Sequence, residues 1–430
     1  MKIGIRREDK SRFEARVPLI PEHVAELIET HHLGVAVQPS PIRAFPNQAY
    51  ERAGATVTED LGDCDLVLGV KEIPLDVFVP GQAYLFFSHT IKGQAYNMPM
   101  LAKLMELGCT LMDYEKIADQ AGRRLIFFGR YAGLAGMIDA LWTLGRRLDH
   151  QGIESPFART KQALHYTDLD HAKQDLAALA QAIQRDGLPD AVQPLVCGFA
   201  GYGNVSQGAQ EVFDLLKPET IAPDALLNLE AGARGCYKVV FHEEHLVRRV
   251  DGSAPFELSE YYDHPDRYQG CFGPYLKHLT LLVNCIYWEP KYPRLVTRAD
   301  IKGLWAGGQP RLKVIADISC DVEGSIECTV RATDPGDPVY VYNPTDGSAA
   351  AGVAGDGPVI LAVDTLPCEL PVDSSRCFSD SLRQWMPQLA TVDWNRELSQ
   401  TGLPDEFARA TLVHRGRLTG PFEYLAKYLP

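Results

Sequence analysis

Short apolar runs alternate with helical patterns along the first third of the chain, and this alternation restricts the possible folds more than any other feature. Strands are predicted at 2–5, 35–39, 66–70, 83–87 and 110–114, with helices at 21–29 and 100–107. Strands that alternate with helices at this spacing pair in parallel, because each helix crosses over one face of the sheet. The first third is therefore predicted to form a doubly wound α/β domain.

The alternation resumes after a long helical pattern at 132–148, which begins with small residues and which we interpret as the connection into a second domain. A chain of 430 residues is long enough for roughly two domains of about 200 residues each. Residues 161–185 are predicted to form a surface helix, 343–357 a loop, and 366–387 and 404–428 mainly helical closing segments. Further strands are predicted at 194–199, 237–241, 279–286, 314–317, 339–342 and 359–364.

Charge and composition narrow the classes of partner. The formal net charge of −14 argues against nucleic acid or a phospholipid surface as the main partner, so small molecules are expected. The sequence contains no run of 18 or more apolar residues, so no membrane span is predicted. The first seven residues lack the apolar core of a signal peptide. The ten cysteines include no C-x-x-C pair, so we expect reduced, buried thiols in a cytoplasmic protein. The oligomeric state stays open.

A glycine-rich segment, residues 198–209, follows a predicted strand and opens a predicted helix. Gly201 would permit a tight turn, and Gly203 would let backbone N–H groups approach a pyrophosphate at the helix N-terminus. The third glycine of G-x-G-x-x-G is replaced by Ser206, and Gly208 comes two residues late, so a purely structural turn is the alternative. Glu219, about 20 residues further on, is the predicted ligand of the adenine ribose, which favours NAD over NADP.

Charged side chains gather where the strands of the first domain are predicted to end. Lys71 and Glu72 follow one strand, His89 and Lys92 follow the next, and Glu115 follows a third. Ligands of α/β sheets bind at the carboxyl ends of the strands, so these residues are candidates for a substrate site. The alternative is solvated loop charge, because charged side chains are mostly exposed.

These motifs resemble the alanine dehydrogenase and saccharopine dehydrogenase superfamily. The closest likeness is to the lysine–ketoglutarate reductase half of the bifunctional aminoadipic semialdehyde synthases, so the second enzyme of those proteins is expected to be absent. The likeness covers nearly the whole chain, at residues 4–10 (GIRREDK), 16–21 (RVPLIP), 69–72 (GVKE), 87–92 (FSHTIK), 96–99 (YNMP), 113–116 (DYEK), 128–133 (FGRYAG), 201–209 (GYGNVSQGA), 264–268 (HPDRY), 286–289 (IYWE), 317–321 (DISCD) and 324–327 (GSIE).

The resemblance implies two Rossmann-like domains with the active-site cleft between them. Residues 1–131 and 366–430 would form the catalytic domain, because the last helices of such proteins return to the first domain, and 132–365 would form the dinucleotide-binding domain. Lys71 and His89 look like the acid–base pair. Residues similar to substrate-binding positions are Arg16, Glu72, Lys92, Glu115, Arg124, Arg130, Asp317 and Asp321, and those similar to cofactor-binding positions, besides Glu219, are Gly201, Tyr202, Gly203, Asn204, Val205, Asn284, Ile286 and Tyr287.

The activity that the resemblance implies is the NAD(P)H-dependent condensation of lysine with 2-oxoglutarate to saccharopine, or its reverse. Proton transfers to and from an amine near neutral pH suit a histidine and a partly desolvated lysine. The tricarboxylate product accounts for the several cations, of which Arg130 favours the reductase subgroup. An alanine-dehydrogenase-like enzyme that uses ammonia and a catalytically silent nucleotide-sensing relative are the alternatives. No metal is expected: the two histidines of residues 242–245 (HEEH) do not have the H-E-x-x-H spacing, which favours a polar surface segment.

Overall fold

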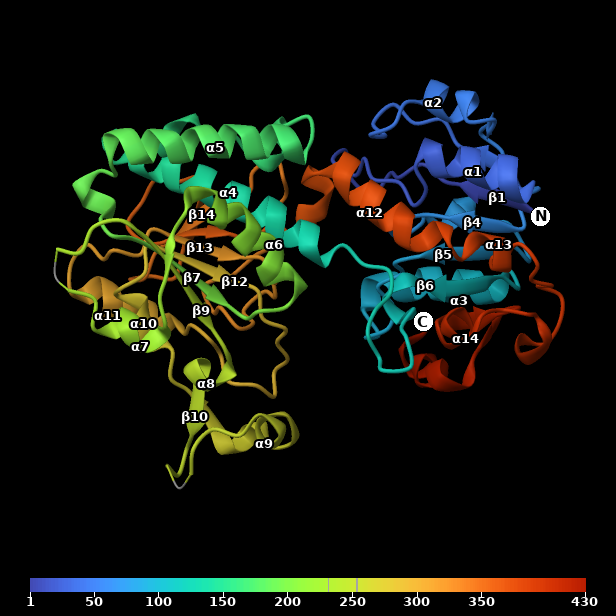
Figure 1. Ribbon diagram of the computed structural model, residues 1–430. Coiled ribbons are helices and arrows are strands. Elements are labelled where there is room, and N and C mark those ends of the chain that lie inside the picture. The colour runs from blue at the N-terminus through green and yellow to red at the C-terminus, as the bar shows by residue number, and fades with distance from the viewer. Residues whose placement is uncertain (231, 253) are drawn as a thin grey trace. The chain divides into compact units, whose positions relative to one another are not determined.

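The computed structural model describes residues 1–230, 232–252 and 254–430, which divide into two compact units (Figure 1). Unit 1 comprises Met1–Phe128 and Pro371–Pro430, and unit 2 comprises Gly129–Leu370. The C-terminal segment thus returns to the unit in which the chain begins, and Arg130 belongs to unit 2.

Unit 1 is built on an eight-stranded sheet with the order β18-β17-β6-β5-β4-β1-β2-β3. The six strands β1 to β6 all pair in parallel, as the alternation of strands and helices predicts. The strand order reverses between β1 and β4, and this is the position at which the loops at the carboxyl ends separate to admit ligands. The strands are β1 (Lys2–Ile5), β2 (Gly34–Val37), β3 (Thr56–Val57), β4 (Leu66–Leu68), β5 (Ala83–Phe86), β6 (Thr110–Asp113), β17 (Thr411–His414) and β18 (Arg417–Leu418).

Two apolar cores cover the two faces of this sheet, because buried side chains alternate between the faces along each strand. Helices α1 (Pro21–His31), α12 (Pro371–Arg383) and α13 (Met386–Leu389) contribute to one core. Helix α3 (Met98–Glu106) and the 3-10 segment η11 (Gly420–Tyr428) contribute to the other. The remaining helices of the unit are α2 (Asn47–Arg52) and α14 (Asp405–Arg409).

The C-terminal segment 404–428 contains the helical elements α14 and η11, as the sequence predicted, and also two strands that the sequence did not predict. After the short helix α14, strands β17 and β18 form an antiparallel hairpin on the edge of the sheet. The two-residue loop is Arg415-Gly416, and both residues have positive φ, 48° and 78°. This is the geometry of a type I′ turn, whose twist matches that of the strands. The sequence did not reveal the hairpin because each strand is too short to show a clear period of two.

Unit 2 contains a second eight-stranded sheet with the order β15-β14-β16-β13-β12-β7-β9-β8. Six strands are parallel, and β14 and β15 form an antiparallel edge, so the predicted loop 343–357 contains a strand. The strands are β7 (Leu195–Ala200), β8 (Glu219–Thr220), β9 (Cys236–Phe241), β12 (Leu281–Asn284), β13 (Val314–Asp317), β14 (Val339–Tyr342), β15 (Ala349–Ala351) and β16 (Val359–Leu361).

Helices cover both faces of this second sheet, as expected for a doubly wound domain (Figure 1). Helices α4 (Gly129–His150), α5 (Leu169–Asp186) and α6 (Asn204–Phe213) cover one face. Helices α7 (Pro223–Leu227), α10 (Gly273–Leu276) and α11 (Arg298–Ala306) cover the other. A small excursion from the carboxyl edge contains α8 (Glu243–Leu246), α9 (Leu258–Asp263) and the two-stranded sheet of β10 (Val247–Arg249) and β11 (Tyr268–Gly270).

Glycines let α4 and α6 approach each other closely. A Cβ added at Gly133 would lie 1.8 Å from the carbonyl oxygen of Val205, and one added at Gly208 would lie 2.1 Å from that of Arg130. Both contacts are with backbone atoms, so neither position accepts a larger residue without a shift of a helix. Gly208, which comes late in the glycine-rich motif, therefore serves helix packing.

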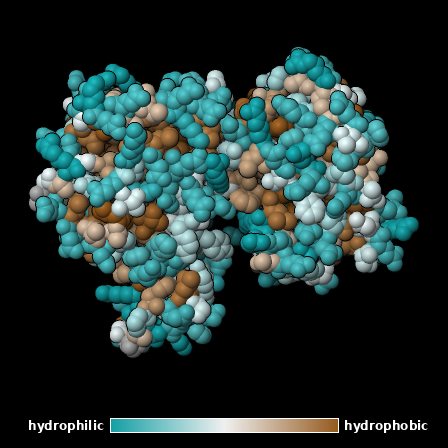
Figure 2. Space-filling model, in the orientation of Figure 1, coloured by the Kyte–Doolittle hydropathy of each residue, from teal (hydrophilic) through white to brown (hydrophobic). Residues whose placement is uncertain are grey.

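Hydrophilic residues cover most of the face shown in Figure 2, with apolar residues gathered in small patches. Within the described part of the chain, no helix combines the length and the apolar character needed to cross a membrane.

Candidate functional site

His89 is held in an unusual backbone conformation at the carboxyl end of β5. Its φ is 48°, a left-handed value that non-glycine residues adopt rarely and often at functional sites. Its Nδ1 lies 2.8 Å from Oε1 of Glu72, which follows the neighbouring strand β4. The Asn97 side-chain amide donates to the backbone oxygens of Ser88 and His89, at 3.1 and 3.2 Å, and so fixes this turn.

The Glu72 carboxylate is buried, with 9% of the residue exposed. Burial alone would raise the pKa of Glu72, but the hydrogen bond and charge of His89, together with the charge of Lys10 at 3.5 Å, lower the pKa to about 2. An ionised carboxylate only accepts hydrogen bonds, so Nδ1 of His89 carries the proton and donates it. The other ring nitrogen, Nε2, takes no part in this bond.

A second buried carboxylate, that of Glu8, holds the segment in which Lys71 lies. It accepts hydrogen bonds from the backbone N–H groups of Val70 and Lys71, at 2.7 and 2.9 Å. Burial, followed by the charge of Glu14, raises the pKa of Glu8 to about 7. The Lys71 side chain is half-buried. Glu8 therefore fixes the backbone at Lys71 and adds a group that titrates near neutral pH.

Arg16 is connected to His89 by a series of contacts between aromatic rings. Its guanidinium stacks over the Phe128 ring, 4.3 Å from the centroid, and the Phe87 ring lies between Phe128 and the imidazole of His89, with centroid distances of 6.1 and 6.4 Å. Arg16 is buried and makes a bidentate ion pair with Glu14. The structure thus brings Arg16, Glu72 and His89, with the backbone of Lys71, to one edge of the unit 1 sheet.

The other predicted substrate-binding residues of unit 1 are at least partly exposed. Lys92 is exposed, and Arg124 is exposed and paired with Glu115 at 2.7 Å. Arg130 is ion-paired with Glu211 of α6 in unit 2, so the structure does not place it with this group.

In unit 2 the glycine-rich segment forms a tight turn between β7 and α6. Gly201 has a φ of +91°, which only glycine adopts readily. Gly203 has an ordinary φ of −73°, and a Cβ added there would meet nothing within 4 Å. Neither conformation nor packing requires a glycine at 203, and the open space above its backbone is what a phosphate group needs for close approach. The first residues of α6, Asn204 and Val205, present backbone N–H groups at the helix N-terminus.

A cavity of about 330 Å³ adjoins this turn. Tyr202 forms one wall, and its ring stacks on His242 at a centroid distance of 4.4 Å. The carboxylate of Glu243 accepts hydrogen bonds from Tyr202 and Tyr262, at 3.4 and 3.0 Å. The other lining residues are Gly201, Gly203, Leu246, Tyr261, Cys285, Ile286, Tyr287 and Tyr292. The turn, Ile286 and Tyr287 are thus brought together as the sequence predicted, and the HEEH segment is part of a pocket wall.

Asn284 and Asp317 end adjacent strands and bond to each other. The Asn284 side chain donates to Asp317 at 2.8 Å and to the hydroxyl of Ser325 at 2.8 Å. Asp317 also accepts from the Thr329 hydroxyl and from the backbone N–H of Cys320, and burial raises its pKa to about 6. Its carboxylate is thus engaged within the protein, where it orients Asn284, and this differs from the predicted contact with substrate. Asp321 follows on the next loop and is half-buried.

The structure does not bring Glu219 to the glycine turn. Glu219 was predicted from its spacing of about 20 residues alone, but the neighbour of β7 is β9, and β8, which contains Glu219, lies outside it. Glu219 is level with Tyr237, whereas Ala200, at the end of β7, pairs with Phe241. The acidic residue at the relevant strand end is Glu243, two residues after Phe241.

Sequence reasoning missed Glu8, Glu14, Asn97 and Glu243 as members of these groups. Glu8 and Glu14 lie in a stretch crowded with charges, so spacing alone did not distinguish them. Glu243 could have been found by counting to the end of the first long strand after the glycine turn, at Phe241.

A family model and two solved structures that resemble this chain show which fold it has. Residues 4–135 match the family model for the N-terminal domain of alanine dehydrogenase/PNT. An L-alanine dehydrogenase structure covers 100% of the chain with a TM-score of 0.63 at 19% identity, and a transhydrogenase from Sinorhizobium meliloti covers 98% with a TM-score of 0.52 at 16% identity. The chain therefore has the two-domain, Rossmann-like α/β fold of the alanine dehydrogenases, and the predicted fold class is confirmed.

The sequence comparisons identify closer relatives. The alpha-aminoadipic semialdehyde synthase of Arabidopsis thaliana is 37% identical over 99% of the chain and 41% of its own length, and the mitochondrial one of Bos taurus is 34% identical over 99% and 47%. The NAD(+), L-lysine-forming saccharopine dehydrogenase of Neurospora crassa is 27% identical over 90% of the chain and 91% of its own length. The chain is a homologue of both groups, which confirms the resemblance, and it spans less than half the length of the two synthases.

Proposed function

We propose that this protein is an oxidoreductase that condenses L-lysine with 2-oxoglutarate and reduces the product to saccharopine, or catalyses the reverse reaction. The observation that carries the proposal is the coincidence of two features. The chain aligns over 90% of its length with an enzyme named for lysine formation from saccharopine, and the predicted acid–base histidine is oriented by a buried carboxylate at the carboxyl edge of the sheet.

In this proposal His89 moves protons through Nε2, because Nδ1 is committed to Glu72. The amine of lysine must lose a proton before it attacks the keto carbon, and the carbinolamine oxygen must gain protons to leave as water. Lys71, whose backbone is fixed by Glu8, is the second proton-transfer group. Oε2 of Glu72 is buried and accepts no hydrogen bond within the described residues, so it is available to a donor such as the substrate amine.

The substrate carboxylates are assigned to cations. Arg16 is positioned by Phe128 and offers a planar fork, although Glu14 must share it. Lys92 and Arg124 are exposed and supply further positive charge. The carboxylate of Glu115, which is paired with Arg124, partly offsets the charge of that guanidinium. Arg130 and Asp321 remain proposed substrate contacts from unit 2.

The cofactor assigned to unit 2 is NAD(H) or NADP(H), which donates or accepts the hydride when bound. Gly201, Gly203 and the N-terminus of α6 would hold its pyrophosphate, and the open space above Gly203 fits that group. Tyr202, Ile286 and Tyr287 line the adjoining cavity, and Asn284, fixed by Asp317, would face the nicotinamide end.

Within this proposal NADH is preferred to NADPH. Glu243 follows the strand beside β7, where an acidic residue accepts hydrogen bonds from the ribose hydroxyls and repels a 2′-phosphate. Glu243→Ser would reduce the ratio of kcat/KM values for NADH over NADPH about tenfold. An unchanged ratio would remove Glu243 from the ribose site.

The deciding experiment is a steady-state assay of NAD(P)H oxidation with 2-oxoglutarate and either lysine or ammonia. We expect turnover with lysine, and a loss of about 100-fold or more in Lys71→Met and in His89→Gln. Turnover with ammonia and not with lysine would replace the proposal by alanine-dehydrogenase-like chemistry. Nucleotide binding without turnover on either amine would favour a sensing role.

A reducing compartment such as the cytoplasm is part of the proposal. No disulfide joins the cysteines of the described residues, and most of them are buried or half-buried. Reduced cysteines are the normal state in the cytosol, where disulfides are rare. Fractionation of cells that express the tagged protein tests this assignment.

A further inference from the structure

Unit 1 contains a cavity of about 300 Å³ that includes none of the predicted catalytic or substrate-contacting side chains. It lies over the β1–β4 part of the sheet, between the loop that follows β3 and the connection from β4 to β5. Part of its lining is apolar, formed by Leu61, Val67, Ile73, Val77 and Val79. A cavity of this size is at the lower end of the range for small-molecule sites.

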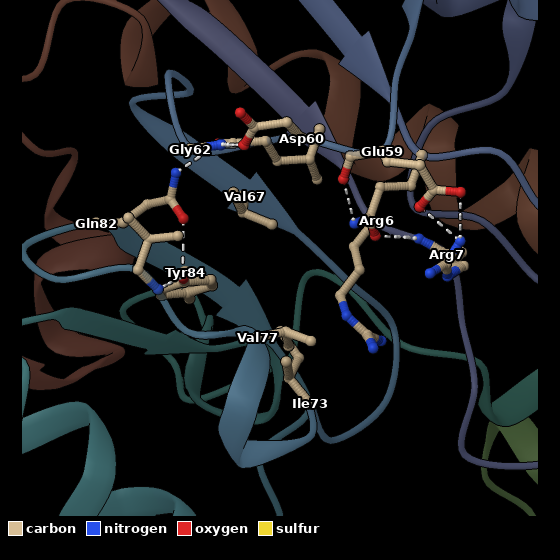
Figure 3. A pocket seen from close by; sticks show the side chains of 13 residues that line it. Arg6, Arg7, Glu59, Asp60, Gly62, Val67, Ile73, Val77, Gln82 and Tyr84 are labelled. Atoms are coloured by element: carbon tan, nitrogen blue, oxygen red, sulfur yellow. Dashed lines mark hydrogen bonds and ion pairs between the residues drawn. The ribbon is translucent and has the colours of Figure 1, made fainter.

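Arg6 reaches this cavity because side chains alternate along β1. Ile3 and Ile5 pack in the core on one face of the sheet, while a Cβ at Gly4 would meet Cys64 and Val67 on the other. Arg6 continues on the side of Gly4. Figure 3 shows its side chain extending toward Ile73 and Val77, whereas Arg7 turns to Glu59.

The Arg6 guanidinium is buried but only partly paired. The residue is 5% exposed, and Nη2 donates to the carboxylate of Asp9. Nη1 is buried and has no hydrogen-bond partner within residues 1–230, 232–252 and 254–430. A buried charged donor without an acceptor is costly, so such a group usually faces water, an ion or a ligand.

Other polar groups of the lining already have partners. Arg7 donates to both oxygens of Glu59, at 3.1 and 2.8 Å. The Tyr84 hydroxyl donates to Gln82 and accepts from the backbone of Val79, both at 2.7 Å, and the Gln82 amide donates to the carbonyl oxygens of Leu61 and Cys64. The buried donor of the lining that has no partner within the described residues is Nη1 of Arg6.

We propose that this cavity binds a small monocarboxylate with an aliphatic body. The carboxylate accepts a hydrogen bond from Nη1 of Arg6, and the aliphatic body packs against Val67, Ile73 and Val77. Phosphate and dicarboxylates fit less well, because Glu59 and Asp60 also line the cavity and repel a second negative charge. The proposal does not depend on the proposed enzymatic function, since it rests on unit 1 residues outside the predicted catalytic group.

The test uses the full chain and isothermal titration calorimetry with sodium isovalerate. We expect saturable binding at one site with a millimolar Kd, weaker binding of acetate, which lacks the aliphatic body, and no saturable binding of inorganic phosphate. Arg6→Gln should weaken isovalerate binding about tenfold or more, since a charge-assisted hydrogen bond is lost. The matched control is Arg7→Gln, which removes an equal charge from the same lining but from a guanidinium that is already paired, and it should change the Kd little.

A second pair of variants covers the case in which Arg6→Gln fails to fold. Val77 is 42% exposed at the edge of the cavity, so a charge is tolerated there. Val77→Glu should weaken isovalerate binding, and Val77→Lys should leave the affinity for isovalerate unchanged or increase it. Absence of saturable isovalerate binding to the wild type would overturn the proposal, and so would equal affinities in the Glu and Lys variants. Tight phosphate binding that Arg6→Gln abolishes would also overturn it, since the site would then be one for polyanions.

Discussion

The imidazole of His89 and the carboxylate of Glu72 form a hydrogen bond of 2.8 Å between Nδ1 and Oε1, although 17 residues separate them in the sequence. The bond joins the ends of two neighbouring parallel strands. Because the pKa of Glu72 is lowered to about 2, its charge is present throughout the neutral range. The pair therefore fixes both the tautomer and the orientation of His89.

Glu72→Gln removes this charge while keeping nearly the same volume. The amide can present either an oxygen or an NH₂ group to Nδ1, so the imidazole is no longer restricted to one tautomer. We expect kcat to fall by about tenfold or more with a smaller change in KM, and the pH profile of kcat to shift. Glu26→Gln, which changes an exposed carboxylate paired with Arg383 in the same unit, is the control and should keep wild-type kinetics. If both variants have the same kcat, Glu72 does not position His89.

Gly203→Ala and Gly208→Ala distinguish ligand binding from folding within one short segment. At Gly203 an added Cβ meets nothing, so the unfolding temperature should not change, while the Kd for NADH should rise about tenfold because the methyl group occupies the phosphate position. At Gly208 the Cβ would meet the backbone of α4 at 2.1 Å, and we expect a loss of about 1–3 kcal/mol in the free energy of unfolding. Thermal unfolding and NADH titration measure the two effects. A destabilised Gly203→Ala protein would contradict the phosphate assignment.

The sequence predicted the parallel core of both sheets because each central strand is an apolar run that is buried on both faces. The strand at 314–317 was predicted with its observed bounds, and β7 and β9 to within about one residue, as expected for strongly apolar segments. Spatial order was harder to predict. Glu219 was assigned to the ribose from its spacing along the sequence, and the placement of β8 outside β9 removed it from the site.

The sequence predicted those residues of the candidate site that directly follow a buried strand. His89 and Glu72 were found because charged residues follow buried strands, and the structure adds the bond between them. The ion pairs of Arg16 with Glu14 and of Arg130 with Glu211 were not predictable, because they depend on side-chain packing of segments that the sequence does not place in space.

Asp139 and Glu369 form a buried carboxyl pair in unit 2 whose charge depends on pH. Burial raises the pKa of Asp139 to about 6, and burial together with the charge of Asp139 raises that of Glu369 well above its ordinary value. Both folded-state values exceed the unfolded ones, so the folded protein retains protons that the unfolded chain releases. Stability is therefore full at pH values below about 4 for this pair and falls as the pH rises through about 6 and beyond.

Glu369→Gln should flatten this dependence, because the amide donates to Asp139 without carrying a titratable proton. We expect the variant to be more stable than the wild type by about 2 kcal/mol at pH 8 and to differ little at pH 5. Urea unfolding at the two pH values measures the difference. Parallel pH dependences in the two proteins would show that the pair does not retain a shared proton.

The turn between β17 and β18 offers a test of the hairpin that the sequence did not predict. Arg415 adopts a φ of 48°, which costs a side chain other than asparagine, aspartate or glycine about 1 kcal/mol. Arg415→Asn should therefore raise the free energy of unfolding by about 0.5–1 kcal/mol. The same substitution two residues later, Arg417→Asn, replaces a strand residue of the same charge and should give no gain. Gly416→Ala should destabilise, since its Cβ would lie 2.5 Å from the carbonyl oxygen of Met105 at a φ of 78°. Equal effects of asparagine at 415 and 417 would mean that charge, and not the left-handed turn, determines the outcome.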